Sequence, residues 1–335
     1  MDTLTHIALG ACIGEIVAGR QIGKKALVLG ALAQNLPDID FVASFWLPTA
    51  GDVMAHRGFT HSLLFAMLVT PLLAWYSTKI FRTGGMEFRR WVLFWGLQIL
   101  VHIFIDAFNA YGTGWFEPFS HYRVSFNTLF VADPLFTLWP AIAAGLLFVS
   151  GLGNRKRIAW AKAGLGLSGL YLLCGVAFKL YIDNAVAGDL KEKGIAAGRY
   201  FTTPTPLNNM LWYVVAEGEN GYYAGYKSVF DKKNAPFRYV YRNDSLLKNE
   251  TGSAELKTLK RFSQGYYSAE MWHDTLVFND MRFGEMLGWR GAETRFVFHY
   301  FLRRQQDNKL IVQRGRFAGW DKATFHAFLR RIKGI

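Results

Sequence analysis

Histidine and aspartate residues recur in and beside the apolar segments of the first 140 residues of this chain. Neutral imidazole and carboxylate groups are the usual protein ligands of zinc and other first-row divalent metals. His102 and Asp106 are four residues apart in an apolar segment, so on a helix they would share one face. His56 and His61 flank a turn that contains Gly58, which can fold both rings toward one point. The spacing predicts a metal site assembled from several segments.

Two more groups of residues belong to the same pattern. Asp38 and Asp40 follow Pro37, which ends or kinks a helix because it has no backbone donor. A carboxylate facing lipid is costly, so the interrupted part should face protein or water. His6 is equally consistent with a ligand and with an ordinary buried polar residue. The candidate metal ligands are therefore His6, Asp38, Asp40, His56, His61, His102 and Asp106.

The predicted cofactor is a divalent metal ion, with zinc first and manganese or iron as alternatives. A bound metal lowers the pKa of its water toward about 7 and so supplies hydroxide at neutral pH. Asp40 is the predicted general base. Arg57 either holds an anionic substrate group or extends its charge to a lipid headgroup. Asp133, followed by Pro134, is expected to cap a helix rather than to bind metal.

The composition indicates what kind of structure positions these residues. The chain is 51% hydrophobic and 16% aromatic, with only 19% charged residues, against about 25% charged in soluble domains. Apolar segments fill the first 182 residues, whereas residues 185–335 contain 24 Lys or Arg and 15 Asp or Glu. We therefore predict an α-helical polytopic membrane domain in residues 1–184, which carries the metal site, and a β-rich α+β soluble domain in residues 185–335.

The membrane domain should contain about five to six apolar helices, one of them broken, since a span needs about 20 mostly apolar residues. The candidate segments are Leu4–Ala18, the interrupted Ala26–Leu47, Thr60–Ile80, Trp91–Ala110, Phe130–Gly151 and Ile158–Ile182. Alternate loops differ in charge, with ten Lys or Arg in three of them and only Arg57 and Arg123 in the two between. The positive-inside rule then predicts that the basic loops, which include Arg82, are cytoplasmic. The metal site and the C-terminal domain would be extracytoplasmic.

The C-terminal part contains segments rich in aromatic and β-branched residues, separated by turn signals, as is typical of strands. Strands are expected at Leu211–Ala216, Gly221–Val229, Phe237–Tyr241 and Thr294–Leu302, and an amphipathic helix at Asp321–Ile332. The net charge of +13 does not indicate nucleic-acid binding, because the basic residues are scattered and no zinc finger or helix-turn-helix spacing is present. The expected partners are the lipid bilayer and a lipid or phosphoester substrate.

Four motifs resemble those of the LexA-regulated, inner-membrane-associated metal-dependent hydrolases, the YdjM-like group with its longer YfhP-like members. The motifs are Asp2-Thr-Leu-Thr-His6, Leu36-Pro-Asp-Ile-Asp40, His56-Arg-Gly-Phe-Thr-His-Ser62 and His102-Ile-Phe-Ile-Asp106. The resemblance implies a bacterial multi-pass membrane protein and a hydrolase. The order of residues is also loosely similar to helical zinc-dependent phospholipases C, although this chain lacks their later His and His-x-x-x-Glu pair.

Three functions are compatible with these observations. Metal-assisted hydrolysis of a phosphoester or another lipid-linked bond at the membrane face explains the ligands and the apolar setting together. A metal-binding transporter is the alternative, because broken helices are common in transporters. A structural or regulatory membrane protein, in which the metal only joins helices, is the third.

Overall fold

The computed structural model describes residues 1–81, 86–290, 295–302, 308 and 320–335. Its internal contacts divide the chain into two compact units. The first, called the helical unit, comprises Met1–Ala43, Ala55–Gly175 and Pro206–Asn208. The second, called the β-rich unit, comprises Ser44–Met54, Val176–Thr205 and Asn209–Ile335. Arg82 and Thr294, which belong to a predicted basic loop and a predicted strand, lie outside the described residues.

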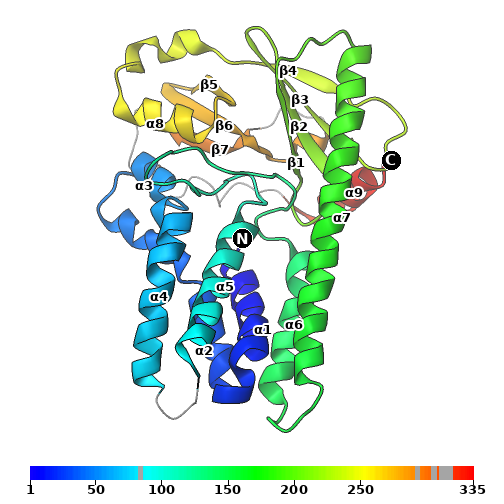
Figure 1. The fold of residues 1–335 in the computed structure, drawn as a ribbon. Coiled ribbons are helices and arrows are strands. Elements are labelled where there is room, and N and C mark those ends of the chain that lie inside the picture. Colours follow the sequence, from blue (N-terminus) through cyan, green and yellow to red (C-terminus); the bar gives the residue numbers. More distant parts are fainter. Residues whose placement is uncertain (82–85, 291–294, 303–307, 309–319) are drawn as a thin grey trace. The chain divides into compact units, whose positions relative to one another are not determined.

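The helical unit is a bundle of helices that run alongside one another (Figure 1). In chain order they are α1 (Thr3–Ile22), α2 (Lys25–Gln34), the 3-10 helices η1 (Pro37–Phe45) and η2 (Phe59–His61), α4 (Leu63–Ile80), α5 (Phe88–Asp106), α6 (Pro134–Val149) and the first part of α7 (Arg157–Glu192). Helix α1 packs against α2, α5 and α6, and α4 packs against α5. Their shared core is formed around Trp91 and Phe94 of α5.

Three helices are long and apolar enough to cross a membrane, namely α4, α5 and α7. Helices α2 and η1 make a fourth candidate if they count as one span bent by 55°, which confirms the predicted break at Pro37. Of the two other predicted spans, α6 has only 16 residues, and α1 contains Glu15 and is buried along most of its length. Three to four spans are therefore shown, where the sequence predicted about five to six.

Helices α1 and α2 cross at very close range because glycines line their contact. A Cβ atom on Gly14 would clash with the backbone of Ala26, and one on Gly30 would clash with the backbone of Gly10. Small residues of this kind allow two helix backbones to approach inside a membrane, where packing drives association. The contact fixes the start of α1 beside the break that follows α2.

A buried ion pair joins α1 to the start of α7. Arg157 donates from Nε and Nη2 to the two carboxylate oxygens of Glu15, both at 2.7 Å. Its Nη1 donates to the backbone oxygens of Leu147 and Ser150. Both side chains are buried, and the bidentate geometry is the strong form of this interaction. The charges of this pair therefore cancel within the protein.

Asp133 caps helix α6, as predicted. Its Oδ1 accepts hydrogen bonds from the backbone N–H groups of Leu135 and Phe136. Tyr171 of α7 donates to its other oxygen at 2.9 Å. Pro134 occupies the first turn, where its missing N–H costs nothing.

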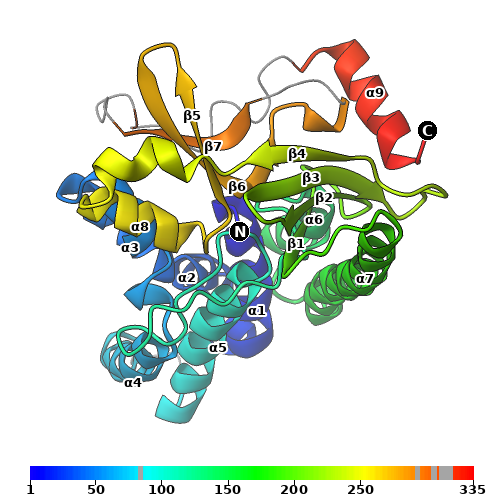
Figure 2. The same ribbon diagram turned by 90° about the horizontal axis from the view of Figure 1, so that it is seen from above.

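The β-rich unit contains two antiparallel sheets, seen from above in Figure 2. The first has the order β1-β2-β3-β4 (Tyr200–Pro204, Leu211–Glu217, Gly221–Ser228, Phe237–Tyr241), and the second has the order β5-β6-β7 (Tyr267–Trp272, Thr275–Glu285, Phe296–Phe301). The remaining elements are α3 (Thr49–Ala55), η3 (Asp244–Glu250), α8 (Ala254–Phe262), η4 (Gly288–Arg290) and α9 (Lys322–Ile332).

The core of the β-rich unit forms where the second part of α7 packs on the first sheet. Ile182 and Val186 of α7 meet Trp212 and Val214 of β2. Phe262 of α8 stacks on the second sheet. Four predicted elements are confirmed in their described parts: β2, β3, β4 and the C-terminal helix α9. The described part of the fourth predicted strand forms β7.

Candidate metal centre

Helix α5 supplies two buried side chains to one point. His102 and Asp106 lie one turn apart, and Nε2 of His102 is 3.6 Å from Oδ2 of Asp106. Neither side chain is accessible to solvent. The i, i+4 spacing thus placed both groups on one helix face, as predicted.

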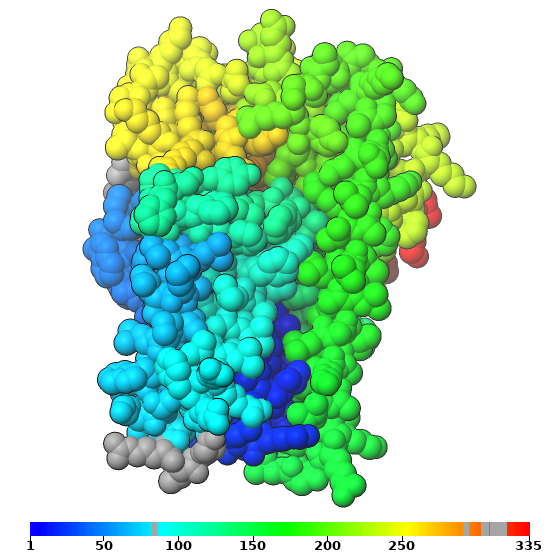
Figure 3. Space-filling view, viewed as in Figure 1, coloured from blue at the N-terminus to red at the C-terminus, as the bar shows by residue number. Residues whose placement is uncertain are grey.

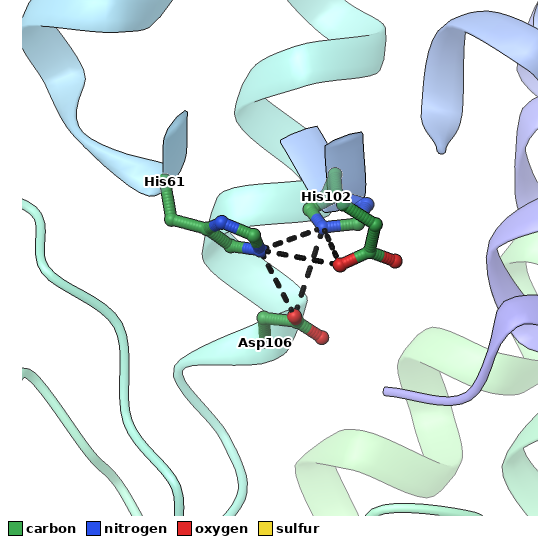
Figure 4. A group of neighbouring side chains, drawn as sticks. His61, His102 and Asp106 are labelled. Atoms are coloured by element: carbon green, nitrogen blue, oxygen red, sulfur yellow. Dashed lines mark hydrogen bonds and ion pairs between the residues drawn. The ribbon is translucent and has the colours of Figure 1, made fainter. Parts of the chain in front are cut away.

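The interrupted segments supply the other two members. Asp38 comes from η1 and His61 from η2, and His61 Nε2 lies 3.5 Å from Asp38 Oδ1 and 3.4 Å from Asp106 Oδ2. His61 and His102 face each other with their Nε2 atoms 3.0 Å apart (Figure 4). We call Asp38, His61, His102 and Asp106 the Asp/His cluster. One ligand atom from each residue lies within 4.8 Å of the other three.

The separations within the Asp/His cluster fit a first-row metal ion. Ligand atoms about 2.0–2.2 Å from one ion at tetrahedral corners lie about 3.3–3.6 Å from one another. The five separations that involve an imidazole nitrogen run from 3.0 to 3.6 Å, and the two carboxylate oxygens lie within 4.8 Å of each other. Two imidazoles and two carboxylates suit zinc, manganese or iron, whereas calcium prefers six to eight oxygen ligands. The cluster can hold one metal ion, whose identity the geometry does not fix.

Hydrogen bonds at the far side of each imidazole set its tautomer. His102 Nδ1 is 2.5 Å from the backbone oxygen of Gln34, which can only accept, so Nδ1 carries the proton. Thr60 gives its hydroxyl proton to Asp40 at 3.1 Å. Its oxygen then accepts from His61 Nδ1 at 3.2 Å. In both rings the Nε2 lone pair therefore points into the cluster.

This arrangement brings acceptors together with no proton between them. Two imidazole lone pairs at 3.0 Å, flanked by two carboxylate oxygens, repel one another in a buried site. A cation at their centre removes that repulsion. Orientation of each metal-binding histidine by an acceptor on its other nitrogen is also the usual arrangement around protein-bound metals.

His6 lies next to the Asp/His cluster but outside its four ligand atoms. Its ring stacks on His102 with centroids 3.9 Å apart, and its Nε2 is 3.2 Å from Asp106 Oδ1. Among the described residues, its Nδ1 has no hydrogen-bond partner. The backbone amino group of Met1 also contacts Asp106 Oδ1. The structure thus places His6 beside the carboxylate rather than among the atoms that surround the ion position.

His56 and Asp40 form a separate pair at the edge of the cluster. His56 Nδ1 is 3.0 Å from Asp40 Oδ1, and the His56 side chain is 39% exposed. The other oxygen of Asp40 accepts from the backbone N–H of Arg57 at 2.7 Å and from Thr60. His56 and His61 flank the turn as predicted, but their ring centroids lie 6.4 Å apart. The turn therefore brings only His61 into the cluster.

Arg57 is buried behind Asp106. Its Nε is 3.1 Å from Asp106 Oδ2, and its Nη1 donates to Asn109 at 2.9 Å. The guanidinium also lies over the ring of Tyr111. Its backbone has φ 60°, in the left-handed region that non-glycine residues rarely adopt and that is enriched at functional sites. The positive charge is thus held inside the unit, next to a cluster carboxylate.

Residues 1–182, more than half of the chain, match the family described as YdjM inner membrane protein. The chain belongs to the YdjM family. All seven candidate ligands fall within the matched residues. The protein is accordingly an inner membrane protein with several apolar helices and contacts the lipid bilayer.

Two curated relatives support membership of the YdjM family. The chain is 35% identical to "Inner membrane protein YbcI" of Escherichia coli over 122 residues, which cover 36% of this chain and 69% of that protein. It is 31% identical to "Uncharacterized protein YfhP" of Bacillus subtilis over 183 residues, which cover 52% of this chain and 53% of YfhP. The chain thus spans about half the length of YfhP. No solved structure matches it.

The sequence did not single out three groups that shape the site in this YdjM-family protein. They are Thr60, the backbone oxygen of Gln34, and Asn109. Thr60 stands inside the motif that contains His61, so its position beside a ligand was a usable signal. The other two are brought in by tertiary contacts, for which the sequence offers no marker.

Proposed function

We propose that this protein is a membrane-bound metal-dependent hydrolase that cleaves a phosphoester or another lipid-linked bond. The observation that carries the proposal is the convergence of four acceptor atoms, from three separate segments, at separations that suit a zinc-sized ion. Zinc is the first choice, and manganese or iron is the alternative. When bound, such an ion supplies a hydroxide at neutral pH and polarises the oxygen that it contacts.

The four residues of the Asp/His cluster would hold the ion. Of the remaining predicted ligands, His6 would orient Asp106, and Asp40 would orient His61 through Thr60. We assign His56 to the pair that it forms with Asp40 rather than to the ion.

Asp40 and Arg57 are proposed to act in the reaction itself. In hydrolysis the oxygen of water forms a new bond to phosphorus, the bond from phosphorus to the leaving oxygen breaks, and a proton passes from the water to the leaving oxygen. Asp40, which shares a hydrogen bond with the partly exposed His56, is the proposed general base for that proton. Arg57 lies within reach of the cluster and would stabilise the negative charge that develops on the phosphoryl oxygens.

The membrane arrangement that we propose follows from loop charge. Helices α1 and α6 would complete about six spans, with the basic loops in the cytoplasm. The metal site and residues 185–335, as a soluble domain, would then be extracytoplasmic, and residues 1–184 would form the membrane domain. A reporter enzyme fused after Ile335 tests this orientation. Activity of a reporter that works only in the cytoplasm would reverse it.

The hydrolase proposal is tested by metal content and turnover together. The purified protein should contain about one equivalent of metal, and Asp106→Asn and His102→Gln should contain almost none. His326→Gln is the matched control, because His326 is an exposed histidine on α9 of the β-rich unit. Turnover is measured on phospholipids, lipid phosphates and generic phosphodiesters, with and without chelator. Bound metal without turnover on any substrate would favour the transport or structural function, and a folded protein without metal would remove the proposal.

A further inference from the structure

The loop between α5 and α6 carries an exposed group of aromatic side chains. We call residues 115–126 the aromatic loop. Phe119 is 83% exposed and Tyr122 is 67% exposed, and Phe116 and Phe126 are also exposed. Figure 3 shows this part of the chain as a continuous surface next to the ends of α4 and α5. Exposed apolar groups of this size on one loop mark an interaction surface rather than a random surface composition.

The aromatic loop is fastened to the segment that supplies the cluster. The backbone N–H of Leu63 donates to Trp115 at 3.0 Å, and that of Gly114 donates to the backbone oxygen of Arg57 at 2.8 Å. Arg123 donates to the backbone oxygen of His56 at 2.8 Å. The loop therefore lies against residues 56–63, two of which are His56 and His61.

The surface of the aromatic loop carries little charge. Arg123 is buried, and so is Arg57 on the neighbouring segment. Glu117 pairs with His121 within the loop at 2.7 Å. A surface rich in exposed Phe and Tyr and poor in net charge fits the water–lipid interface, where amphipathic aromatic rings concentrate. It does not fit an anionic macromolecule, which would require exposed cations.

An apolar groove continues from the lipid-facing side of the spans to this loop. It has a volume of about 290 Å³ and is lined by Leu63, Leu100, Val101, Ile103, Phe104 and Trp115. Leu100 and Phe104 are exposed on α5, one of the three helices that are long and apolar enough to span. The groove thus joins a surface that contacts acyl chains to the loop that contacts the cluster segment.

We propose that the aromatic loop lies in the lipid headgroup layer and that the groove takes an acyl chain of a membrane lipid. The substrate is then a phosphoester-containing lipid that reaches the cluster from the bilayer, not a soluble phosphoester. The identity of the substrate rests on the hydrolase function proposed above, whereas the position of the loop does not. Because the loop has little net charge, its insertion should not depend on anionic lipids or on salt.

The position of the loop is tested by spin labelling in vesicles of zwitterionic phospholipid. Phe119→Cys is made in a Cys174→Ser background, in which Cys12 is buried. Collision of the nitroxide with oxygen and with a water-soluble nickel chelate reports its depth. Leu72→Cys, on the exposed apolar face of α4, serves as the bilayer reference, and Ser245→Cys, in the β-rich unit, as the water reference. A label at 119 that resists the nickel chelate is expected, and one as accessible as that at 245 overturns the proposal.

The substrate is tested by comparing two assays on one variant. Phe116→Ser combined with Phe119→Ser should lower hydrolysis of a phospholipid in vesicles by about tenfold or more, since two exposed apolar side chains that would enter the lipid are lost. Hydrolysis of a short-chain, water-soluble phosphodiester should change by less than about twofold. Equal loss on both substrates overturns lateral access from the bilayer. If the wild type hydrolyses neither substrate, the hydrolase function fails, and the labelling result still decides the position of the loop.

Discussion

The Glu15–Arg157 pair and the Asp/His cluster are both buried in the helical unit, but they differ in how donors and acceptors are matched. In the Glu15–Arg157 pair, each carboxylate oxygen accepts a hydrogen bond from a guanidinium N–H. The remaining Arg157 nitrogen donates to backbone oxygens. In the Asp/His cluster, carboxylate oxygens and imidazole lone pairs face one another. The first group is closed by its own residues. The second keeps two imidazole nitrogens facing carboxylate oxygens, with Arg57 3.1 Å from Asp106 Oδ2, and could hold a metal ion.

The difference separates a buried pair whose charges match from a buried cluster that could hold a metal ion. A buried ion pair with full hydrogen bonding adds little net stability, because its attraction is offset by the free energy of removing both charges from water. Its main effect is to fix how the two helices lie against each other. A buried group of acceptors is unfavourable by itself, and the Asp/His cluster could hold a metal ion that offsets this cost. The four predictions that follow treat the two groups in parallel, from the largest expected effect to the smallest.

Arg157→Ala should destabilise the protein by about 3–5 kcal/mol, because it leaves Glu15 buried without its partner. The double variant Glu15→Leu with Arg157→Met should recover most of that loss, since it removes both charges and keeps the volume. Neither variant should change the metal content. Unfolding in detergent, followed by circular dichroism, measures the first two effects. A loss of metal in these variants would show that the two groups are not independent.

Removal of metal should lower the stability of the wild type by about 2.7 kcal/mol when free metal had been present at about 100 times its dissociation constant. Asp106→Asn should show no such dependence, because it has lost a ligand. Thermal unfolding with added zinc and with chelator measures the difference. Equal stabilisation of the wild type and Asp106→Asn would mean that zinc binds elsewhere.

Thr60→Val should weaken metal binding by about tenfold, the lower end of the range for residues that orient a ligand. The hydroxyl oxygen that accepts from His61 Nδ1 is lost, although Asp40 remains 3.4 Å from that nitrogen. Thr78→Val is the matched control, because the Thr78 hydroxyl donates to the backbone oxygen of Trp75 in its own helix. Competition against a fluorescent zinc chelator measures both affinities. The same affinity in both variants would exclude an orienting role for Thr60.

Tyr171→Phe should cost about 0.5–1.5 kcal/mol, the contribution of one ordinary hydrogen bond. The lost bond runs to Asp133, a buried carboxylate that also accepts from two backbone N–H groups of α6 and so remains partly satisfied. Metal content should stay the same. A larger loss of stability, or a loss of bound metal, would mean that Asp133 acts together with the Asp/His cluster rather than only as a helix cap.

Local patterns allowed much of this site to be predicted from the sequence. The spacing of His102 and Asp106 fixes their shared helix face, Pro37 fixes the break, and Asp133 with Pro134 fixes a helix start. Each of these depends on a few neighbouring residues. The same is true of β2, β3 and β4, which are rich in aromatic residues.

The parts that the sequence did not predict depend on contacts between distant segments. Glu15 and Arg157 are 142 positions apart, and nothing near either residue marks the other as its partner. His56 lies outside the cluster because the turn points its ring and the ring of His61 in different directions, with the ring centroids 6.4 Å apart. Strands β5 and β6 were missed because their residues mix apolar side chains with Asp, Asn and Glu. Asn279 and Asp280 are buried through tertiary packing, which the sequence does not mark.

The interruption after α2 has a consequence for proton chemistry. In a continuous helix the backbone oxygen of Gln34 would accept from the amide of residue 38. Pro37 and the bend leave that oxygen to His102 instead. Replacing Pro37 by alanine would let the amide of residue 38 bond to the backbone oxygen of Gln34. The His102 ring could then carry its proton on Nε2, the nitrogen that faces the Asp/His cluster. The backbone oxygen that the break leaves free thus decides which nitrogen of His102 carries the proton and which one is basic.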